Sequence, residues 1–278
     1  MKVIEIPQLL PSGGRLTGYL HEPDDFFIHR GRRPAVVVIP GGGYQKLAER
    51  ETDPVAFEFF SAGFNTFILR YSIRDENHPE PLGLDPLAQA SKALVTIRNN
   101  AAEWNTRENQ VAVLGFSAGG HLAASCATLW DLPELQELVD TEGARARPDA
   151  AVLCYAVTVA GEYAHESSIA NLVRNLAGEE VMDPTLFDLT KHVKRNTPPC
   201  FIWSTVSDEL VPVENSLLFA QSLQTWNIPY ELHLYPSGRH GLTLGMMETN
   251  ESHPHLASWV RLCKEWLGDL FRFPISIV

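Results

Sequence analysis

Residues 111–121 of this chain read VAVLGFSAGGH. The first four residues form a short apolar run typical of a buried strand, and the small residues at 121–127 favour a helix. Ser117 stands between them at the tip of a sharp turn, with Gly115 and Gly119 on either side. Such a turn strains the serine backbone and projects its hydroxyl above the sheet edge, and glycines are expected because a Cβ there would clash with the neighbouring strand or helix. Ser117 is therefore a candidate nucleophile.

The Gly-x-Ser-x-Gly pattern alone is weak evidence for a nucleophile. With average glycine and serine usage it arises by chance in roughly one chain in ten of this length. A glycine-rich turn without chemistry is the alternative interpretation. The flanking strand and helix, together with suitable partner residues elsewhere in the chain, favour the nucleophile.

Strand-like and helix-like segments alternate over most of the chain. Apolar runs predict strands at residues 35–40, 65–70, 111–114, 150–155, 199–204 and 230–235, and apolar residues at helical spacing predict helices at 54–62, 85–104, 215–226 and 255–270. The segments at 3–6 and 16–20 alternate more regularly and predict antiparallel edge strands. This order predicts an α/β fold, in which helices cover both faces of a doubly wound, mostly parallel sheet of about eight strands.

Two segments do not fit this alternation. Residues 127–148 are polar and charged, and residues 156–198 contain helical fragments but no strand-like run. Insertions that follow strand ends lie over the carboxyl edge of the sheet, where α/β proteins bind ligands. We therefore expect a single domain over residues 1–278, in which residues 156–198 form a small cap beside Ser117.

The composition is that of an ordinary globular protein, with 45% hydrophobic and 20% charged residues. The formal net charge of −12 argues against nucleic acid or an anionic membrane as a partner. No apolar run approaches transmembrane length and no signal peptide is visible, so we expect a cytoplasmic location. Four cysteines lie in apolar patterns and are interpreted as reduced core residues: Cys126, Cys154, Cys200 and Cys263.

A serine nucleophile needs a general base, and that base needs a carboxylate to orient it. Asp208 lies in the segment STVSDELVP (residues 204–212), directly after a predicted strand and before a predicted helix. Glu209 and Glu214 are the alternatives. Glu209 points away if Asp208 points inward, and Glu214 is typical of a carboxylate in the first turn of a helix. Asp208 is therefore the predicted acid.

The predicted base is His240, which lies in the segment PSGRHG (residues 236–241) directly after the last predicted strand. His233 alternates within that strand and His121 lies on the helix after the turn, so both are interpreted as structural. The chain order serine, acid, histidine is that of α/β-hydrolase triads.

The segment PGGGY at residues 40–44 follows a predicted buried strand. Its three glycines allow backbone N–H groups to turn inward toward a developing oxyanion, and the amide of Ala118 would supply a second donor. Tyr44 either lines the acyl pocket and binds substrate or packs against the loop, and the sequence leaves both open.

Four further polar residues have weaker functional interpretations. His253 and His255 flank a proline at a helix start without cysteine or carboxylate spacing, so solvent exposure is favoured over a metal site. Arg74 and Asp75 follow a predicted strand and either bind substrate or belong to a solvated loop, which is the favoured interpretation.

Taken together, the PGGGY segment, the GFSAGGHLA segment (residues 115–123) and the Asp208 and His240 loops resemble the α/β-hydrolase superfamily. More narrowly they resemble the esterase/lipase branch related to hormone-sensitive lipase, including bacterial acetyl xylan esterases and feruloyl esterases. The resemblance covers nearly the whole chain and implies Gly42 and Gly43 as the oxyanion donors of the loop. Pro40 stands where many members of the branch have histidine, which slightly disfavours a lipase and leaves the backbone donors intact.

We therefore expect a serine carboxylesterase that hydrolyses small-molecule esters through an acyl-enzyme, with no metal or organic cofactor. The resemblance implies short acyl chains, including acetyl groups on sugars. A serine peptidase of the prolyl-oligopeptidase kind and a non-catalytic binding protein on the same scaffold are the alternatives. The sequence leaves the alcohol part of the substrate and the oligomeric state open.

Overall fold

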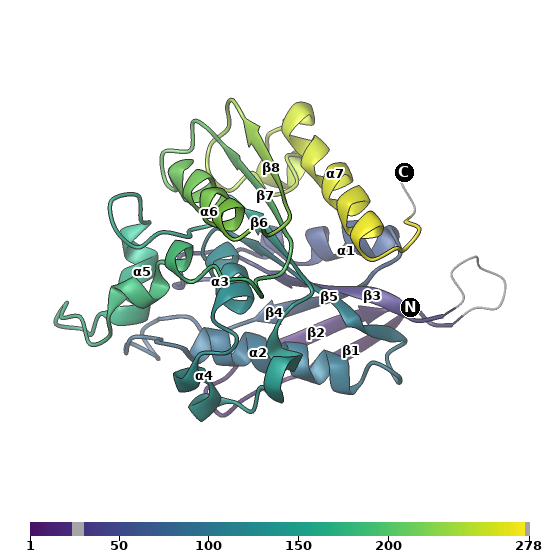
Figure 1. Ribbon diagram of the computed structural model, residues 1–278, viewed down its shortest axis with the longest axis horizontal. Coiled ribbons are helices and arrows are strands. Elements are labelled where there is room, and N and C mark those ends of the chain that lie inside the picture. The colour runs from purple at the N-terminus through teal and green to yellow at the C-terminus, as the bar shows by residue number, and fades with distance from the viewer. Residues whose placement is uncertain (24–30, 276–278) are drawn as a thin grey trace.

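The computed structural model describes residues 1–23 and 31–275. At its centre is an eight-stranded sheet with the spatial order β1-β2-β4-β3-β5-β6-β7-β8 (Figure 1). The strands are β1 (Lys2–Ile6), β2 (Arg15–Leu20), β3 (Arg33–Ile39), β4 (Asn65–Arg70), β5 (Thr106–Phe116), β6 (Ala150–Cys154), β7 (Cys200–Thr205) and β8 (Tyr230–Tyr235). The β1–β2 and β2–β4 pairs are antiparallel and the remaining pairs are parallel. The mostly parallel sheet predicted from the sequence is thus confirmed.

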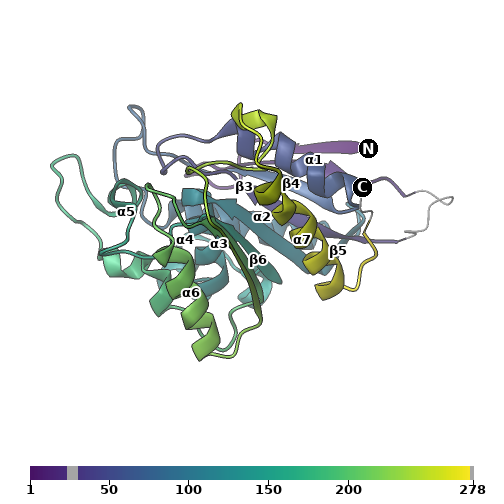
Figure 2. The ribbon, with the colours of Figure 1, turned by 90° about the horizontal axis from the view of Figure 1, so that it is seen from above.

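Helices cover both faces of this sheet and make a three-layer structure (Figures 1 and 2). Helices α1 (Asp53–Ser61) and α7 (Pro254–Leu270) pack on one face, and α2 (Asp85–Asn99), α3 (Ser117–Thr128) and α6 (Glu214–Thr225) pack on the other. Two shorter helices are α4 (Pro133–Leu138) and α5 (Glu166–Val173). The 3₁₀ turns are η1 (Glu49–Glu51), η2 (Gly143–Ala146), η3 (Pro184–Phe187), η4 (Leu189–Lys191) and η5 (Met247–Thr249).

Strand β3 shows why the sheet is buried on both faces. Ala35, Val37 and Ile39 pack into the core beneath α2 and α3, whereas Val36 and Val38 pack beneath α1 and α7. Side chains of successive strand residues point to opposite faces, so an unbroken apolar run supplies both cores at once. The candidate site forms beyond the carboxyl ends of these parallel strands, because Ser117, Asp208 and His240 follow β5, β7 and β8.

The predicted helix at 85–104 is too long, because α2 ends at Asn99. Asn100 donates from its side chain to the Thr96 carbonyl oxygen, and Asn105 adopts a left-handed conformation with φ of 51° that turns the chain into β5. Trp104 is buried because it packs on Phe67 of β4, with ring centroids 5.7 Å apart, and not because it lies on a helix. Trp104 thus has helical spacing in the sequence, although its burial comes from a contact with strand β4.

The two segments that break the alternation contain short helices in the structure. Residues 127–148 include α4 and η2, and residues 156–198 include α5, η3 and η4. Asn215 at the start of α6 holds the second segment, since its side chain accepts from the Thr158 amide and donates to the Tyr163 carbonyl oxygen, both at 2.8 Å. Across residues 1–23 and 31–275, no helix is long and apolar enough to cross a membrane.

Candidate active site

Ser117 occupies the tight turn between β5 and α3. Its φ is 52°, in the left-handed region that a residue with a side chain seldom adopts. A Cβ on Gly115 would lie 2.1 Å from the Gly119 carbonyl oxygen, and a Cβ on Gly119 would lie 2.3 Å from the Ile39 carbonyl oxygen. Both glycines are therefore required by close backbone approach, as the sequence predicted.

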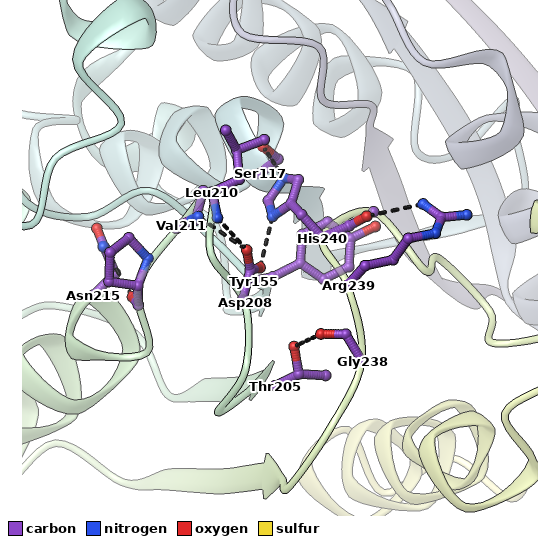
Figure 3. A network of polar contacts seen from close by, with 12 residues as sticks. Ser117, Tyr155, Thr205, Asp208, Leu210, Val211, Asn215, Gly238, Arg239 and His240 are labelled. Carbon is purple, nitrogen blue, oxygen red and sulfur yellow. Dashed lines mark hydrogen bonds and ion pairs between the residues drawn. The ribbon is translucent and has the colours of Figure 1, made fainter.

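The structure brings Ser117, His240 and Asp208 into one hydrogen-bonded chain (Figure 3). His240 Nε2 lies 2.8 Å from Ser117 Oγ, and His240 Nδ1 lies 2.7 Å from Asp208 Oδ2. The three side chains come from positions that follow β5, β8 and β7. A carboxylate on Nδ1 favours the tautomer in which Nε2 accepts the serine proton.

Backbone amides fix the Asp208 carboxylate, which is buried. Its Oδ1 accepts from the Leu210 and Val211 amides at 2.9 and 3.0 Å, which leaves Oδ2 for the imidazole (Figure 3). Glu209 is exposed and Glu214 opens α6, and neither carries a hydrogen bond to His240. Of the three carboxylates considered from the sequence, Asp208 is the one that the fold places on the imidazole.

Side chains at the end of β7 hold the histidine loop. Thr205 Oγ1 donates to the Gly238 carbonyl oxygen at 2.8 Å (Figure 3). Ser207 Oγ accepts from the Gly238 amide at 3.0 Å. Asp208 directly follows Ser207, and Gly238 lies two residues before His240. These hydrogen bonds therefore connect the loop that carries the acid to the loop that carries the base. This connection limits how far the imidazole can move from the carboxylate.

The glycine loop lies beside Ser117. Its residues Gly42 and Gly43 have φ of 127° and 67°, and the amides of both have no acceptor among the described residues. Gly41 differs, since its amide donates to Glu51 Oε2 at 2.8 Å. The Ala118 amide lies in the first turn of α3, where a helix leaves its N–H groups unbonded. Three N–H groups near Ser117 are thus free to bind an oxyanion.

Tyr44 turns away from this loop into the core. Its side chain is 1% exposed and its hydroxyl lies 2.8 Å from His121 Nδ1, while His121 Nε2 faces the Phe187 carbonyl oxygen at 3.1 Å. The imidazole therefore donates to Phe187 and accepts from Tyr44, and burial lowers the pKa of His121 to about 4. The placement favours the packing interpretation of Tyr44 over substrate binding, and His121 has the structural position expected.

A cavity of about 400 Å³ opens at Ser117. Its lining includes Gly42, Gly43, Gln45, Lys46, Ser167 and His165. His165 is half-buried, and its Nδ1 lies 2.7 Å from Ser168 Oγ. Burial lowers the pKa of His165, which favours its neutral form. No sequence motif marks His165, because it is a lone histidine in an irregular segment.

The remaining candidates lie away from this cavity. His233 pairs with Glu231 at 2.7 Å on β8, and His253 pairs with Glu251 at 2.9 Å. No group of three or more potential metal-ligating side chains was found in residues 1–23 and 31–275. The four cysteines are buried and free, as predicted.

Hydrogen bonds within the loop and to Tyr44 hold the segment that carries Arg74 and Asp75. Arg74 Nε donates to the Pro79 carbonyl oxygen at 2.7 Å, and its amide donates to the Tyr44 carbonyl oxygen at 2.7 Å. Asp75 Oδ1 accepts from the Asn77 amide at 2.8 Å. Both side chains thus have structural partners within their own part of the fold.

Two further residues next to the triad were missed from the sequence. Glu51 is buried beneath the glycine loop, and the Tyr155 ring packs against the His240 ring with centroids 4.9 Å apart. Glu51 ends a charged run that reads as a solvated surface, and Tyr155 reads as the last residue of a strand. Neither position carries a local signal of its role, because both are defined by contacts across the fold.

Comparison with known proteins identifies relatives over most of the chain. The model of the BD-FAE family matches residues 28–223. Endo-1,4-beta-xylanase B of Butyrivibrio fibrisolvens is 40% identical over 232 residues, which cover 82% of this chain and 34% of that protein. Acetylxylan esterase of Xylanibacter ruminicola is 29% identical over 218 residues, which cover 76% of this chain and 41% of that protein.

A solved structure matches at nearly full length. The acetyl ester-xyloside bifunctional hydrolase of Caldicellulosiruptor lactoaceticus superposes with a TM-score of 0.77 at 35% identity, covering 95% of this chain and 90% of that one. By contrast, the chain spans well under half the length of the two curated relatives, at 34% and 41%.

Proposed function

The chain belongs to the BD-FAE family and has the α/β-hydrolase fold, and from this membership we propose that it is a serine carboxylesterase acting on short acyl esters. The observation that carries the proposal is the hydrogen-bonded chain of Ser117, His240 and Asp208 beside unbonded backbone amides. Nucleophile, base, orienting acid and oxyanion donors are the parts that acyl transfer needs.

In the proposed reaction, Ser117 Oγ attacks the ester carbonyl carbon while its proton passes to His240 Nε2. The amides of Gly42, Gly43 and Ala118 bind the oxyanion, and each donor of this kind typically contributes about 2.7–4 kcal/mol to lowering the barrier. His240 then gives the proton to the leaving alcohol, which leaves an acyl-serine. Water attacks this ester with His240 as base, and the acid and free serine are released.

Acetyl esters of sugars are the proposed substrate class. Two relatives support it, because one is named an acetylxylan esterase and the other an acetyl ester-xyloside bifunctional hydrolase. The polar side chains of Gln45, Lys46 and His165 around the cavity suit a hydroxyl-rich alcohol better than a lipid. We propose that residues 156–198 act as a small cap, since His165 and Ser167 from this segment contribute to the cavity wall.

Substitution of Ser117 and covalent labelling of its hydroxyl test the proposal most directly. Ser117→Ala should abolish hydrolysis of aryl acetates and acetylated xylo-oligosaccharides while the melting temperature stays close to that of the wild type. An organophosphonate should label Ser117, as identified by peptide mass spectrometry. The matched control is Ser167→Ala, which removes another serine hydroxyl from the same cavity and should leave labelling intact.

Three results would contradict the proposal. These are a wild-type protein without esterase activity, substantial activity in Ser117→Ala, and phosphonate attached to another residue. Aminoacyl amides belong in the same substrate panel, because faster cleavage of amides than of esters would favour a peptidase.

A further inference from the structure

Glu51 is a buried carboxylate that the proposed reaction does not use. It ends the 3₁₀ turn η1 and is 1% exposed. Its Oε2 accepts from the Gly41 amide at 2.8 Å, and its Oε1 accepts from the Tyr155 hydroxyl at 2.9 Å. The guanidinium of Arg50 lies 3.4 Å from Oε1. Burying a carboxylate costs folding free energy, and hydrogen bonds and an ion pair offset that cost. The contacts of Glu51 therefore show what keeps this group buried next to Ser117 and His240.

The partners of Glu51 indicate that it is ionised. The Thr243 amide donates to the Tyr155 hydroxyl at 3.2 Å, so the single hydroxyl proton of Tyr155 is directed to the carboxylate. Gly41 and Arg50 can only donate. Burial holds the pKa of Glu51 above its ordinary value, although the Arg50 charge and the hydrogen bonds from Gly41 and Tyr155 offset part of this increase. An ionised carboxylate can only accept hydrogen bonds, and it therefore suits the three donors Gly41, Tyr155 and Arg50.

These contacts join the two loops that must cooperate in catalysis. On one side, Glu51 holds Gly41, which is adjacent in the chain to the two glycines with unbonded amides. On the other side, Tyr155 packs against the His240 ring, with ring planes at 71° (Figure 3). Arg50 adds a second link, because its Nε donates to the Gly241 carbonyl oxygen at 3.1 Å.

We propose that Glu51 is a positioning residue that fixes the glycine loop relative to His240 and places a second negative charge behind the imidazole. The inference rests on the proposed esterase function and adds a residue to its machinery. Attack by Ser117 creates an imidazolium, and a preorganised negative charge stabilises that charge without reorganisation. Glu51 acts through Gly41 and Tyr155, whereas Asp208 contacts the imidazole directly.

Two substitutions of Glu51 distinguish the effect of its negative charge from that of its hydrogen bond to Gly41. Glu51→Gln keeps an oxygen that can accept from Gly41 but removes the negative charge, so we expect kcat to fall about tenfold with KM within about threefold of the wild type. Glu51→Ala removes both, so we expect kcat to fall more than about 100-fold. Glu49→Gln is the matched control, since Glu49 lies in the same turn, is 69% exposed and pairs with Arg70 at the surface.

A pH profile distinguishes this role from a structural one. The ionisable groups that face His240 and Glu51 are Asp208, Tyr155, Arg50, His165 and Tyr71. Removing the negative charge of Glu51 destabilises a positive charge that forms at the catalytic base. The acidic limb of kcat/KM should therefore move to lower pH in Glu51→Gln and stay unchanged in Glu49→Gln.

Tyr155→Phe keeps the inference testable if Glu51→Gln does not fold. It removes the hydroxyl between the carboxylate and Thr243 but keeps the ring against His240, so we expect a smaller fall in kcat with little change in KM. The inference is wrong if the folded variants keep the kcat and the acidic limb of the wild type while Ser117→Ala is inactive. That result leaves the proposed function standing, whereas an inactive wild-type protein refutes both.

Discussion

Asn171 Nδ2 donates a 2.8 Å hydrogen bond to the carbonyl oxygen of Gly43, a residue 128 positions earlier in the chain. Helix α5, which carries Asn171, is thereby attached to the loop with the unbonded amides. The backbone of α5 also accepts at the Asn171 and Leu172 carbonyl oxygens from the amides of Leu82 and Gly83. The segment over the sheet edge thus supports the candidate oxyanion site as well as contributing to the cavity.

Asn171→Ala should lower kcat because it frees the Gly43 carbonyl and lets the adjacent amides shift. We expect a fall of roughly tenfold, smaller than the 10²–10³-fold typical of losing one oxyanion donor outright. Steady-state kinetics on an aryl acetate measure the effect. The control is Asn175→Ala, whose side chain bonds only within its own exposed turn. Equal kcat values for the two variants would show that the hydrogen bond from Asn171 to Gly43 does not affect catalysis.

Asp208→Asn should lower kcat by about 10⁴-fold, the size of the effect when a triad aspartate becomes asparagine. The Leu210 and Val211 amides would keep the remaining oxygen, so the new NH₂ group would face His240 Nδ1. That contact selects the tautomer with the proton on Nε2, which cannot accept from Ser117. Glu209→Gln changes an exposed neighbour and should stay within about twofold of the wild type. A larger loss in Glu209→Gln than in Asp208→Asn would reverse the acid assignment.

Acetyl and propionyl esters should be the best substrates, with kcat/KM falling steeply as the acyl chain lengthens. The cavity of about 400 Å³ is lined in part by polar side chains such as Gln45 and Lys46, and interfacial lipid binding needs a large exposed apolar surface. Acyl-length profiling with a common leaving group measures this preference. Highest kcat/KM on long-chain esters, or activation by lipid aggregates, would contradict it.

Acid should destabilise the protein through His121, whose pKa burial lowers to about 4 from an ordinary value of 6.5. The unfolded state binds the proton first, so stability is full above pH 6.5 and decreases as the pH falls toward 4. At pH 5 this histidine should remove about 2 kcal/mol relative to pH 7. His21 has its pKa lowered in the same direction and contributes in the same sense.

Urea denaturation of wild type and His121→Gln at pH 7 and pH 5 isolates this contribution. The difference between the two pH values should be smaller in the variant, because any constant cost of the substitution cancels in the comparison. An unchanged difference would mean that His121 does not carry the acid sensitivity.

Much of the fold follows from local pattern. The unbroken apolar run in β3 and the strand, turn and helix around Ser117 predicted a buried parallel sheet with a serine at its edge. These features are local because side-chain alternation and backbone conformation act over a few neighbouring residues. The positions of Asp208 and His240 after strands were also visible, since the carboxyl ends of parallel strands meet at one edge of a sheet.

The tertiary structure decided which of several similar side chains face one another. Trp104 has helical spacing but packs on β4 after α2 has ended, and Tyr44 sits in the glycine loop but turns inward to His121. Glu51 resembles any surface carboxylate in the sequence, yet it is buried against Gly41 and Tyr155. The physical reason is sequence distance: Glu51 and Tyr155 are 104 positions apart, and their contact exists only after β3 and β6 have joined the same sheet.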